Sequence, residues 1–143
     1  MKADLEKAQA LFAQGDYTCV LCKGEIVYTA TEHGIKPLMT WINNGVDLRG
    51  FCAADRIVGK AAALLYVLLG VDTVYAPVMS EAGMDTLTQN GITPLFDNSV
   101  KEIRNRTDTG LCPMEEAVQD ISDPNEGLAA LKERIREMMA LRS

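Results

Sequence analysis

The residues best suited to chemistry gather in a polar segment over residues 101–110 and in the stretch that follows it. Arg104 and Arg106 flank Asn105 in this segment. Two guanidinium groups suit a phosphate or a carboxylate, and an asparagine side chain suits a base or an amide. Cys112 then stands at the expected start of a helix, where a thiolate is favoured. These residue types predict an anion-binding site with a thiol beside it.

Other candidates stand earlier in the chain, beside apolar segments. Asp55 lies in the first turn of one expected helix, and Ser80 is a good N-cap for another that continues with Glu81. Less specific roles stay open for each candidate. Asp55 and Ser80 could only cap helices, the arginines could pair with surface carboxylates in an acidic protein, and Cys112 could be buried and inert.

The cysteines suggest a metal site only in part. Cys19 and Cys22 have the spacing of half a zinc knuckle, but neither Cys52 nor Cys112 has a second Cys or a His three residues away. We expect Cys19 and Cys22 to share a strand, on which positions three apart point to opposite faces. The prediction is therefore four free thiols and no metal.

Two further sequence features resemble known catalytic or phosphate-binding motifs, but the residues that these motifs also require are absent. Gly59 and Lys60 resemble the end of a phosphate loop, but Ala54 stands where that loop needs its first glycine and Ala61 where it needs Ser or Thr. The alternative for Lys60 is a side chain that extends from a buried helix toward water. His33, the sole histidine, lies in a turn and is expected to be exposed rather than part of a catalytic triad.

The elements that must position these residues alternate between helix and strand. Helical patterns cover residues 3–14, a short segment from Pro37 to Asn44, 53–69, 80–90, a segment from Cys112, and 124–141. Strand patterns cover residues 17–22 and 25–31, which form a hairpin, and then 71–78 and 92–96. This order predicts an α/β domain with a mixed sheet of about four or five strands, in which parallel strands follow the hairpin and helices cover both faces.

Composition limits the function further. The 143 residues are 48% hydrophobic and show no linker, which predicts a single domain over residues 1–143. The net charge of −6 argues against nucleic-acid binding. The longest apolar run, residues 61–71, is shorter than the roughly 20 residues of a membrane-spanning helix, and the charged N-terminus does not resemble an export signal. We therefore expect a cytoplasmic protein with no membrane contact.

Several strings of residues resemble a small family of uncharacterised bacterial proteins with a cytidine-deaminase-like fold. They are CAADRIVGKAAA at residues 52–63, SEA at 80–82, IRNR at 103–106 and CPME at 112–115. The resemblance covers about residues 3–121. It implies a three-layer cytidine-deaminase-like fold, and the family has no established activity to carry over.

The match to true deaminases breaks down at their zinc ligands. Zinc deaminases place His or Cys, then Ala, then a Glu proton shuttle at the start of the buried helix, and Pro-Cys-x-x-Cys at the start of the next. Here Ala54 replaces the shuttle that would follow Cys52, while Val78 and Glu81 replace the two later cysteines. One thiol and one carboxylate do not make a catalytic zinc site, so the resemblance implies the fold without zinc or another cofactor.

The same architecture implies one cleft at the N-termini of two helices, whose dipoles favour an anion. It would bring Cys52 and Asp55 near Ser80 and Glu81. The catalytic candidates are then Asp55, Glu81 and Cys112. The candidates for ligand binding are Cys52, Lys60, Ser80, Arg104, Asn105, Arg106 and Glu115.

Three hypotheses follow for the function. The first is a zinc-independent, deaminase-like protein that binds a nucleotide-like or other anionic small molecule in the cleft and modifies it through Asp55, Glu81 or Cys112. The second is a non-enzymatic ligand-sensing or regulatory module that uses the same cleft. The third is a structural subunit, such as a homodimer, whose last helix packs Met138, Met139 and Leu141 against a partner chain.

Overall fold

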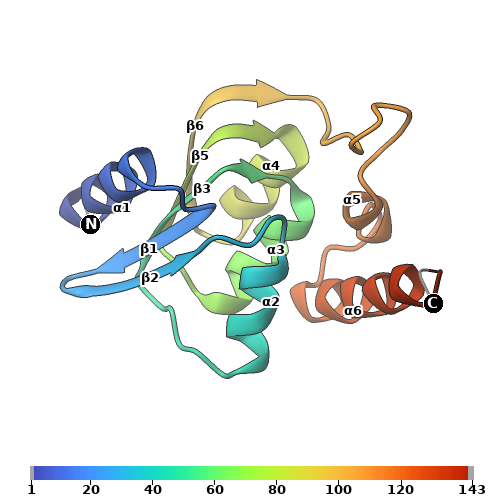
Figure 1. Cartoon of the computed structure of the whole chain (residues 1–143), viewed down its shortest axis with the longest axis horizontal. Coiled ribbons are helices and arrows are strands. Elements are labelled where there is room, and N and C mark those ends of the chain that lie inside the picture. The colour runs from blue at the N-terminus through green and yellow to red at the C-terminus, as the bar shows by residue number, and fades with distance from the viewer. Residues whose placement is uncertain (1, 142–143) are drawn as a thin grey trace.

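The computed structural model describes residues 2–141, which form a mixed α/β fold (Figure 1). Its helices are α1 (Lys2–Gln14), α2 (Lys36–Asn43), α3 (Lys60–Leu69), α4 (Glu81–Gln89), α5 (Pro113–Ala117) and α6 (Pro124–Leu141). Its strands are β1 (Cys19–Lys23), β2 (Ile26–Ala30), β3 (Cys52–Asp55), β4 (Ile57–Val58), β5 (Thr73–Ser80) and β6 (Thr93–Val100). The predicted N-terminal helix, hairpin and C-terminal helix are all confirmed.

The sheet combines an antiparallel half with a parallel half. β1 pairs antiparallel with both β2 and β3, whereas β3, β5 and β6 run parallel. β4 continues the line of β3 along β5, because Cys52 lies opposite Thr73 and Ile57 lies opposite Val78 in one unbroken register. The sheet therefore has six strands instead of the predicted four or five, with β3 and β4 separated only by Arg56.

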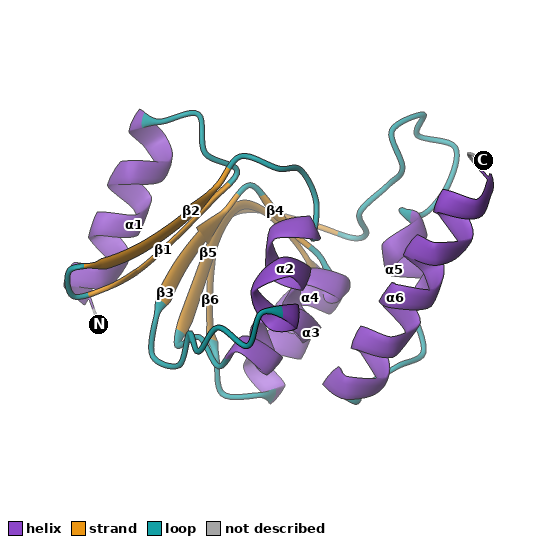
Figure 2. Ribbon diagram, turned by 60° about the horizontal axis from the view of Figure 1, so that its bottom comes forward, coloured by secondary structure: helices purple, strands orange, loops and turns teal. Residues whose placement is uncertain are grey.

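Helices cover the two faces of the sheet unequally, as Figure 2 shows. α1 lies alone on one face, whereas α2, α3 and α4 cover the other, and α5 and α6 lie outside them. β1 contributes to both sides, since Cys19 packs in the large core under α3 and Cys22 packs in the small core under α1. The prediction that these two cysteines point to opposite faces is confirmed.

The prediction of one helix over residues 53–69 is wrong. Residues 52–55 form β3, whose backbone is fixed by β1 on one side and by β5 on the other. Gly59 is still extended, and α3 begins only at Lys60 and ends at Gly70, which has a φ of 78°. A continuous apolar run fits a strand buried on both faces as well as it fits a buried helix, and here the sheet partners decide.

The C-terminal helix packs on the domain itself. α6 contacts α3 and α5, and Leu131 is fully buried. The carboxylate of Asp123 accepts the backbone N–H of Asn125 at 2.8 Å, as expected of an N-cap. Met139 and Leu141 are exposed by 63% and 88%. Among the helices of residues 2–141, none combines the length and apolar character needed to cross a membrane.

Candidate functional site

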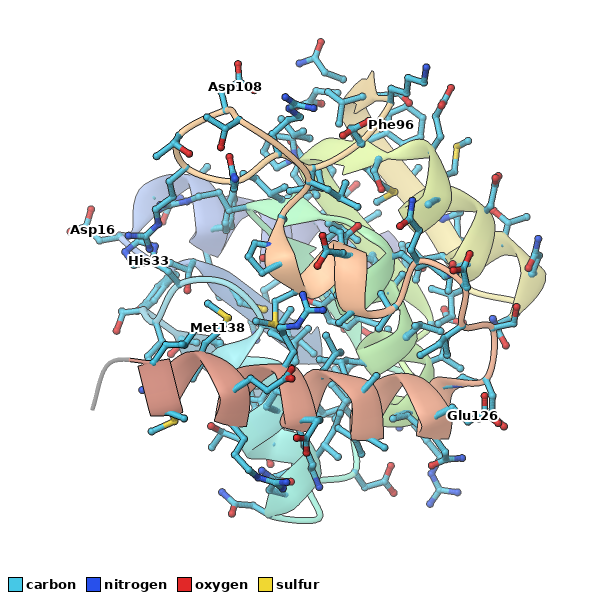
Figure 3. All side chains as sticks on the ribbon, turned by 90° about the vertical axis from the view of Figure 1, so that its right-hand side faces the viewer. Asp16, His33, Phe96, Asp108, Glu126 and Met138 are labelled. Carbon is cyan, nitrogen blue, oxygen red and sulfur yellow. The ribbon has the colours of Figure 1, made fainter. Side chains whose placement is uncertain are left out.

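A cleft of about 710 Å³ opens at the carboxyl end of β3, between the loop after β2 and the segment that joins β6 to α5. Parallel strands commonly place ligands at this edge of a sheet. In Figure 3 the segment with Asp108 arches above α5, and His33 lies below this segment. We call this the arginine cleft. Its polar lining is formed by Thr18, His33, Asp55, Arg56, Arg106, Cys112 and Glu115.

Asp55 is the buried acid of the arginine cleft. Only 7% of the residue is exposed, although it lines the cavity. Its Oδ2 accepts a hydrogen bond from the Tyr66 hydroxyl at 2.6 Å, and its Oδ1 accepts the backbone N–H of Arg56 at 2.7 Å. Burial raises the pKa of Asp55 to about 6, against the opposing effect of these two hydrogen bonds. The group can therefore exchange a proton near neutral pH.

Tyr66 connects Asp55 to the interior of the fold. Its hydroxyl lies 3.2 Å from the Sγ of Cys19 as well as 2.6 Å from Asp55. Burial raises the pKa of Tyr66 and of Cys19, and the negative charge of Asp55 adds to both shifts. Both side chains thus hold their protons at neutral pH, and the three residues form a hydrogen-bonded chain that ends in the cleft.

The arginines fall into two classes. Four of them form ion pairs with carboxylates: Arg49, Arg104, Arg134 and Arg136. Within residues 2–141, Arg56 and Arg106 are the arginines without an ion pair, and both line the arginine cleft. Both are exposed. In a protein with a net charge of −6, this cavity therefore gathers two exposed guanidinium groups that form no ion pair within the described residues.

Glu115 lines this cleft next to the N-terminus of α3. Its Oε1 accepts the backbone N–H of Lys60 at 2.7 Å, and its Oε2 accepts that of Ala61 at 2.8 Å. A Cβ atom at Gly59 would collide with this carboxylate, so glycine is required for the close approach. Burial raises the pKa of Glu115, while the two amide hydrogen bonds oppose the shift. The anion position at this helix terminus is thus filled by the protein's own carboxylate.

A second cleft of about 720 Å³ lies on the other side of Glu115, and we call it the acidic cleft. Five Asp or Glu residues line it, including Glu81 and Glu115, against the two lysines Lys60 and Lys101. Lys60 donates from Nζ to the backbone carbonyl of Gln119 at 3.0 Å. This balance of charge disfavours an anion.

Ser80 also lines the acidic cleft, but its hydroxyl is already engaged. Its Oγ accepts the backbone N–H of Gly83 at 3.0 Å, so Ser80 caps α4 as predicted. The predicted single cleft is therefore two clefts. Asp55, Arg106 and Cys112 line the first, Lys60, Ser80 and Glu81 line the second, and Glu115 lines both.

Three other candidates lie outside both clefts. Cys52 does not begin a helix, and this prediction is wrong: it is fully buried in β3, directly opposite Cys22 on β1. Arg104 donates to Asp108 at 2.9 Å and to Glu102 at 3.2 Å. Its guanidinium is therefore held within its own loop.

Asn105 is held in the same loop. Its Oδ1 accepts the backbone N–H of Thr109 at 3.0 Å, and its Nδ2 donates to the Thr109 hydroxyl at 3.1 Å. The asparagine stabilises the turn that presents Arg106. Its side chain is already paired on both its donor and its acceptor atom.

Sequence reasoning missed Tyr66, Arg56 and Thr18 as site residues. Tyr66 sits in an apolar stretch that gives no sign of a partner, and Asp55 is its partner only because β3 lies beside α3. Arg56 carried a signal in its position next to Asp55. Within residues 2–141, no three His, Cys, Asp or Glu side chains are grouped so that they could hold a metal ion.

The comparisons with known proteins agree with this fold. The model of a family described as a domain of unknown function (DUF1893), TM1506, matches residues 7–135. The crystal structure of a DUF1893 family protein (TM1506) from Thermotoga maritima is similar, with a TM-score of 0.86 and 23% sequence identity over 94% of this chain and 91% of that chain. No curated protein matches the chain. The chain belongs to the DUF1893 family.

Proposed function

We propose that the arginine cleft binds a small anionic molecule, and that this binding is the protein's function or its first step. The observation that carries the proposal is the pair of arginines, Arg56 and Arg106, which line one cavity without an ion pair among the described residues. A guanidinium fork suits phosphate and carboxylate groups in particular.

The remainder of the lining favours a ligand with a flat or apolar body. Ile35, Ile57, Ile103 and Met114 line the cavity, and Ile57 is exposed by 48%. Large apolar side chains around a few polar groups are typical of small-molecule sites. A nucleotide-like ligand meets both demands, because its phosphate suits the arginines and its base suits the apolar walls.

The proposed anion site is at Arg56 and Arg106 and not at the helix N-termini that the sequence suggested. Ser80 caps α4 and Glu115 caps α3, so the backbone amides first expected to bind an anion already have acceptors. The resemblance of the strings at residues 52–63, 80–82, 103–106 and 112–115 to a family with a cytidine-deaminase-like fold supports a place in that superfamily. Chemistry without zinc is supported by the described residues, among which no three His, Cys, Asp or Glu side chains are grouped to hold a metal ion.

A thermal-shift screen tests the proposal. Nucleoside monophosphates should raise the melting temperature, their uncharged nucleosides should not, and added salt should weaken the effect. Arg56→Gln and Arg106→Gln should each abolish the shift. The control is Arg136→Gln, which removes an equal charge from an exposed ion pair on α6 and should keep it. A shift that survives in both cleft variants would refute the proposal.

The second candidate is a sensor that binds its ligand without changing it. Cys112 is only partly buried and lines the cleft with Asp55. The cleft therefore holds side chains that could serve either an enzyme or a sensor. Incubation of a stabilising ligand with intact protein separates them. Product that accumulates, and that stops with Asp55→Asn, identifies an enzyme, whereas a ligand unchanged over hours identifies the sensor.

A further inference from the structure

We propose that Asp55 is the proton donor of the arginine cleft, a carboxylic acid that hydrogen-bonds to the anion bound between Arg56 and Arg106. This inference rests on the proposed function and adds a chemical role to the same site. It predicts that the ligand presents an acceptor oxygen to Asp55 and that it binds together with a proton.

The direction of the hydrogen bonds carries the argument. The Tyr66 hydroxyl donates to Oδ2 of Asp55, and the backbone N–H of Arg56 donates to Oδ1. Cys19 completes the chain behind Tyr66, and because the Tyr66 hydrogen is donated to Asp55, the Cys19 thiol can donate its own hydrogen to the Tyr66 oxygen. Every protein partner of the carboxyl group is therefore a donor.

As long as the Tyr66 hydrogen points to Oδ2, a proton on Asp55 is directed to the cavity. Because both oxygens accept hydrogen bonds from the protein, the acid O–H finds its acceptor in the cavity that Asp55 lines. The burial of the residue, which raises its pKa to about 6, makes the protonated form available under mildly acidic conditions. An anion in the cavity favours that form further, since a charged Asp55 would repel it.

Other titratable and charged groups surround Asp55 and must be separated from it. Tyr66 lies on α3 and Cys19 on β1, while Glu115 and Cys112 lie at α5. His33 and Arg106 face the cavity from two loops, and Arg56 follows Asp55 directly. Of these, His33 requires its own control, because it is the one histidine of the sequence and it lines the same cavity.

Sulfate is the probe, because it keeps its charge between pH 5 and pH 8. Its affinity for the full chain is measured by NMR titration at constant ionic strength. We expect wild-type affinity to fall about tenfold from pH 5 to pH 8, which corresponds to a rise of about one unit in the Asp55 pKa on binding. Asp55→Asn should bind sulfate equally well at both pH values, whereas His33→Gln should keep the tenfold fall in affinity.

A second measurement uses the wild-type protein alone, in case Asp55→Asn does not fold. The ¹³C signal of the Asp55 carboxyl group should titrate near pH 6 and shift to higher pH in sulfate. Tyr66→Phe removes a hydrogen bond that favours the charged form of Asp55. In this variant the Asp55 carboxyl group should therefore titrate at a higher pH than in the wild type. That response identifies Tyr66 as a positioning residue.

The outcomes separate the two proposals. The role of Asp55 is overturned if sulfate binds through Arg56 and Arg106 but Asp55→Asn leaves the pH dependence of its affinity unchanged. It is also overturned if sulfate does not shift the pH at which the Asp55 ¹³C signal titrates. Either result leaves the proposal of anion binding intact. If neither sulfate nor a nucleotide binds at any pH, the proposed function fails and the inference fails with it.

Discussion

The arginine cleft and the acidic cleft are nearly equal in volume, share Glu115 as a wall, and differ in how their charges are paired. In the arginine cleft the two arginines form no ion pair within residues 2–141, and the two carboxyl groups accept hydrogen bonds from the protein. In the acidic cleft the carboxylates outnumber the lysines, and the Lys60 ammonium bonds a backbone carbonyl.

The two clefts thus differ in the pairing of their charged residues, which the number of charged residues alone does not show. Arg104 and Arg106 stand two residues apart in one loop, yet Arg104 is paired with Glu102 and Asp108. Arg106 has no such pair among the described residues and turns to the cavity. The following substitutions test which residues stabilise both clefts and which residues matter for only one of them.

The largest effect should come from the helix that both clefts share. Leu64 on α3 is fully buried, and it packs against α6 at Gly127. Leu64→Ala should lower the free energy of unfolding by about 2–5 kcal/mol, because it leaves a cavity in the core. Leu141→Ala, at a site that is 88% exposed, is the matched control and should cost less than about 0.5 kcal/mol. Equal effects in urea denaturation would contradict the packing of α3.

The next effect concerns the buried acid of the arginine cleft. The pKa of Asp55 is about 6 in the folded protein and near 3.8 when unfolded, so between these values the folded state binds more protons. The contribution of Asp55 to the free energy of unfolding is fully present below pH 3.8 and is lost as the pH rises through 6. The free energy of unfolding of the wild type, relative to that of Asp55→Asn, should therefore fall by about 2 kcal/mol over this interval.

Urea denaturation at a series of pH values measures this difference. Asp85→Asn is the control for the loss of one negative charge, because it removes an exposed carboxylate from the acidic cleft. A difference between wild type and Asp55→Asn that stays flat from pH 4 to pH 6.5 would mean that the carboxyl group is not buried as described.

A smaller effect is expected at the wall between the clefts. Glu115→Ala leaves the backbone N–H groups of Lys60 and Ala61 without their acceptor and should cost about 1–3 kcal/mol. Glu116→Ala is the neighbouring control. It breaks an exposed ion pair with Arg134 and should cost less than about 1 kcal/mol. The order of the two variants in urea denaturation decides whether Glu115 caps α3.

The smallest effect should distinguish a ligand-binding arginine from a structural one. Arg56→Gln and Arg106→Gln should change the free energy of unfolding by less than about 0.5 kcal/mol, because neither side chain forms an ion pair with another described residue. Arg134→Gln should cost about 1–2 kcal/mol, since this side chain donates to the carbonyl of Pro113 at 2.6 Å and so ties α6 to α5. A larger loss at Arg106 than at Arg134 would make Arg106 structural.

Local patterns in the sequence predict most of the fold. The apolar spacing of residues 3–14 and 124–141, the hairpin turn at Gly24 and the cap at Ser80 are each settled by neighbours along the chain. The segment over residues 52–58 is different. Its apolar residues suit either a helix or a buried strand, and the hydrogen bonds that decide come from β1 and β5, which are distant in the sequence.

The candidate site was predictable only where one residue's type is decisive. Asp55 and Arg106 are candidates by their charge and chemistry, and both line the arginine cleft. The division into two clefts depends on Glu115, which caps a helix that begins 55 residues earlier. The pairing of Tyr66 with Asp55 likewise follows from the packing of α3 against β3 and not from any local motif.

The central claim is that the arginine cleft is where this protein holds an anion. Crystals soaked at pH 5.5 in selenate, a sulfate analogue with an anomalous scatterer, test it by position. The account predicts an anomalous peak between the guanidinium groups of Arg56 and Arg106, within hydrogen-bond distance of Asp55, that is lost in Arg106→Gln. A peak in the acidic cleft at Lys60 and Lys101, with none in the arginine cleft, would contradict it.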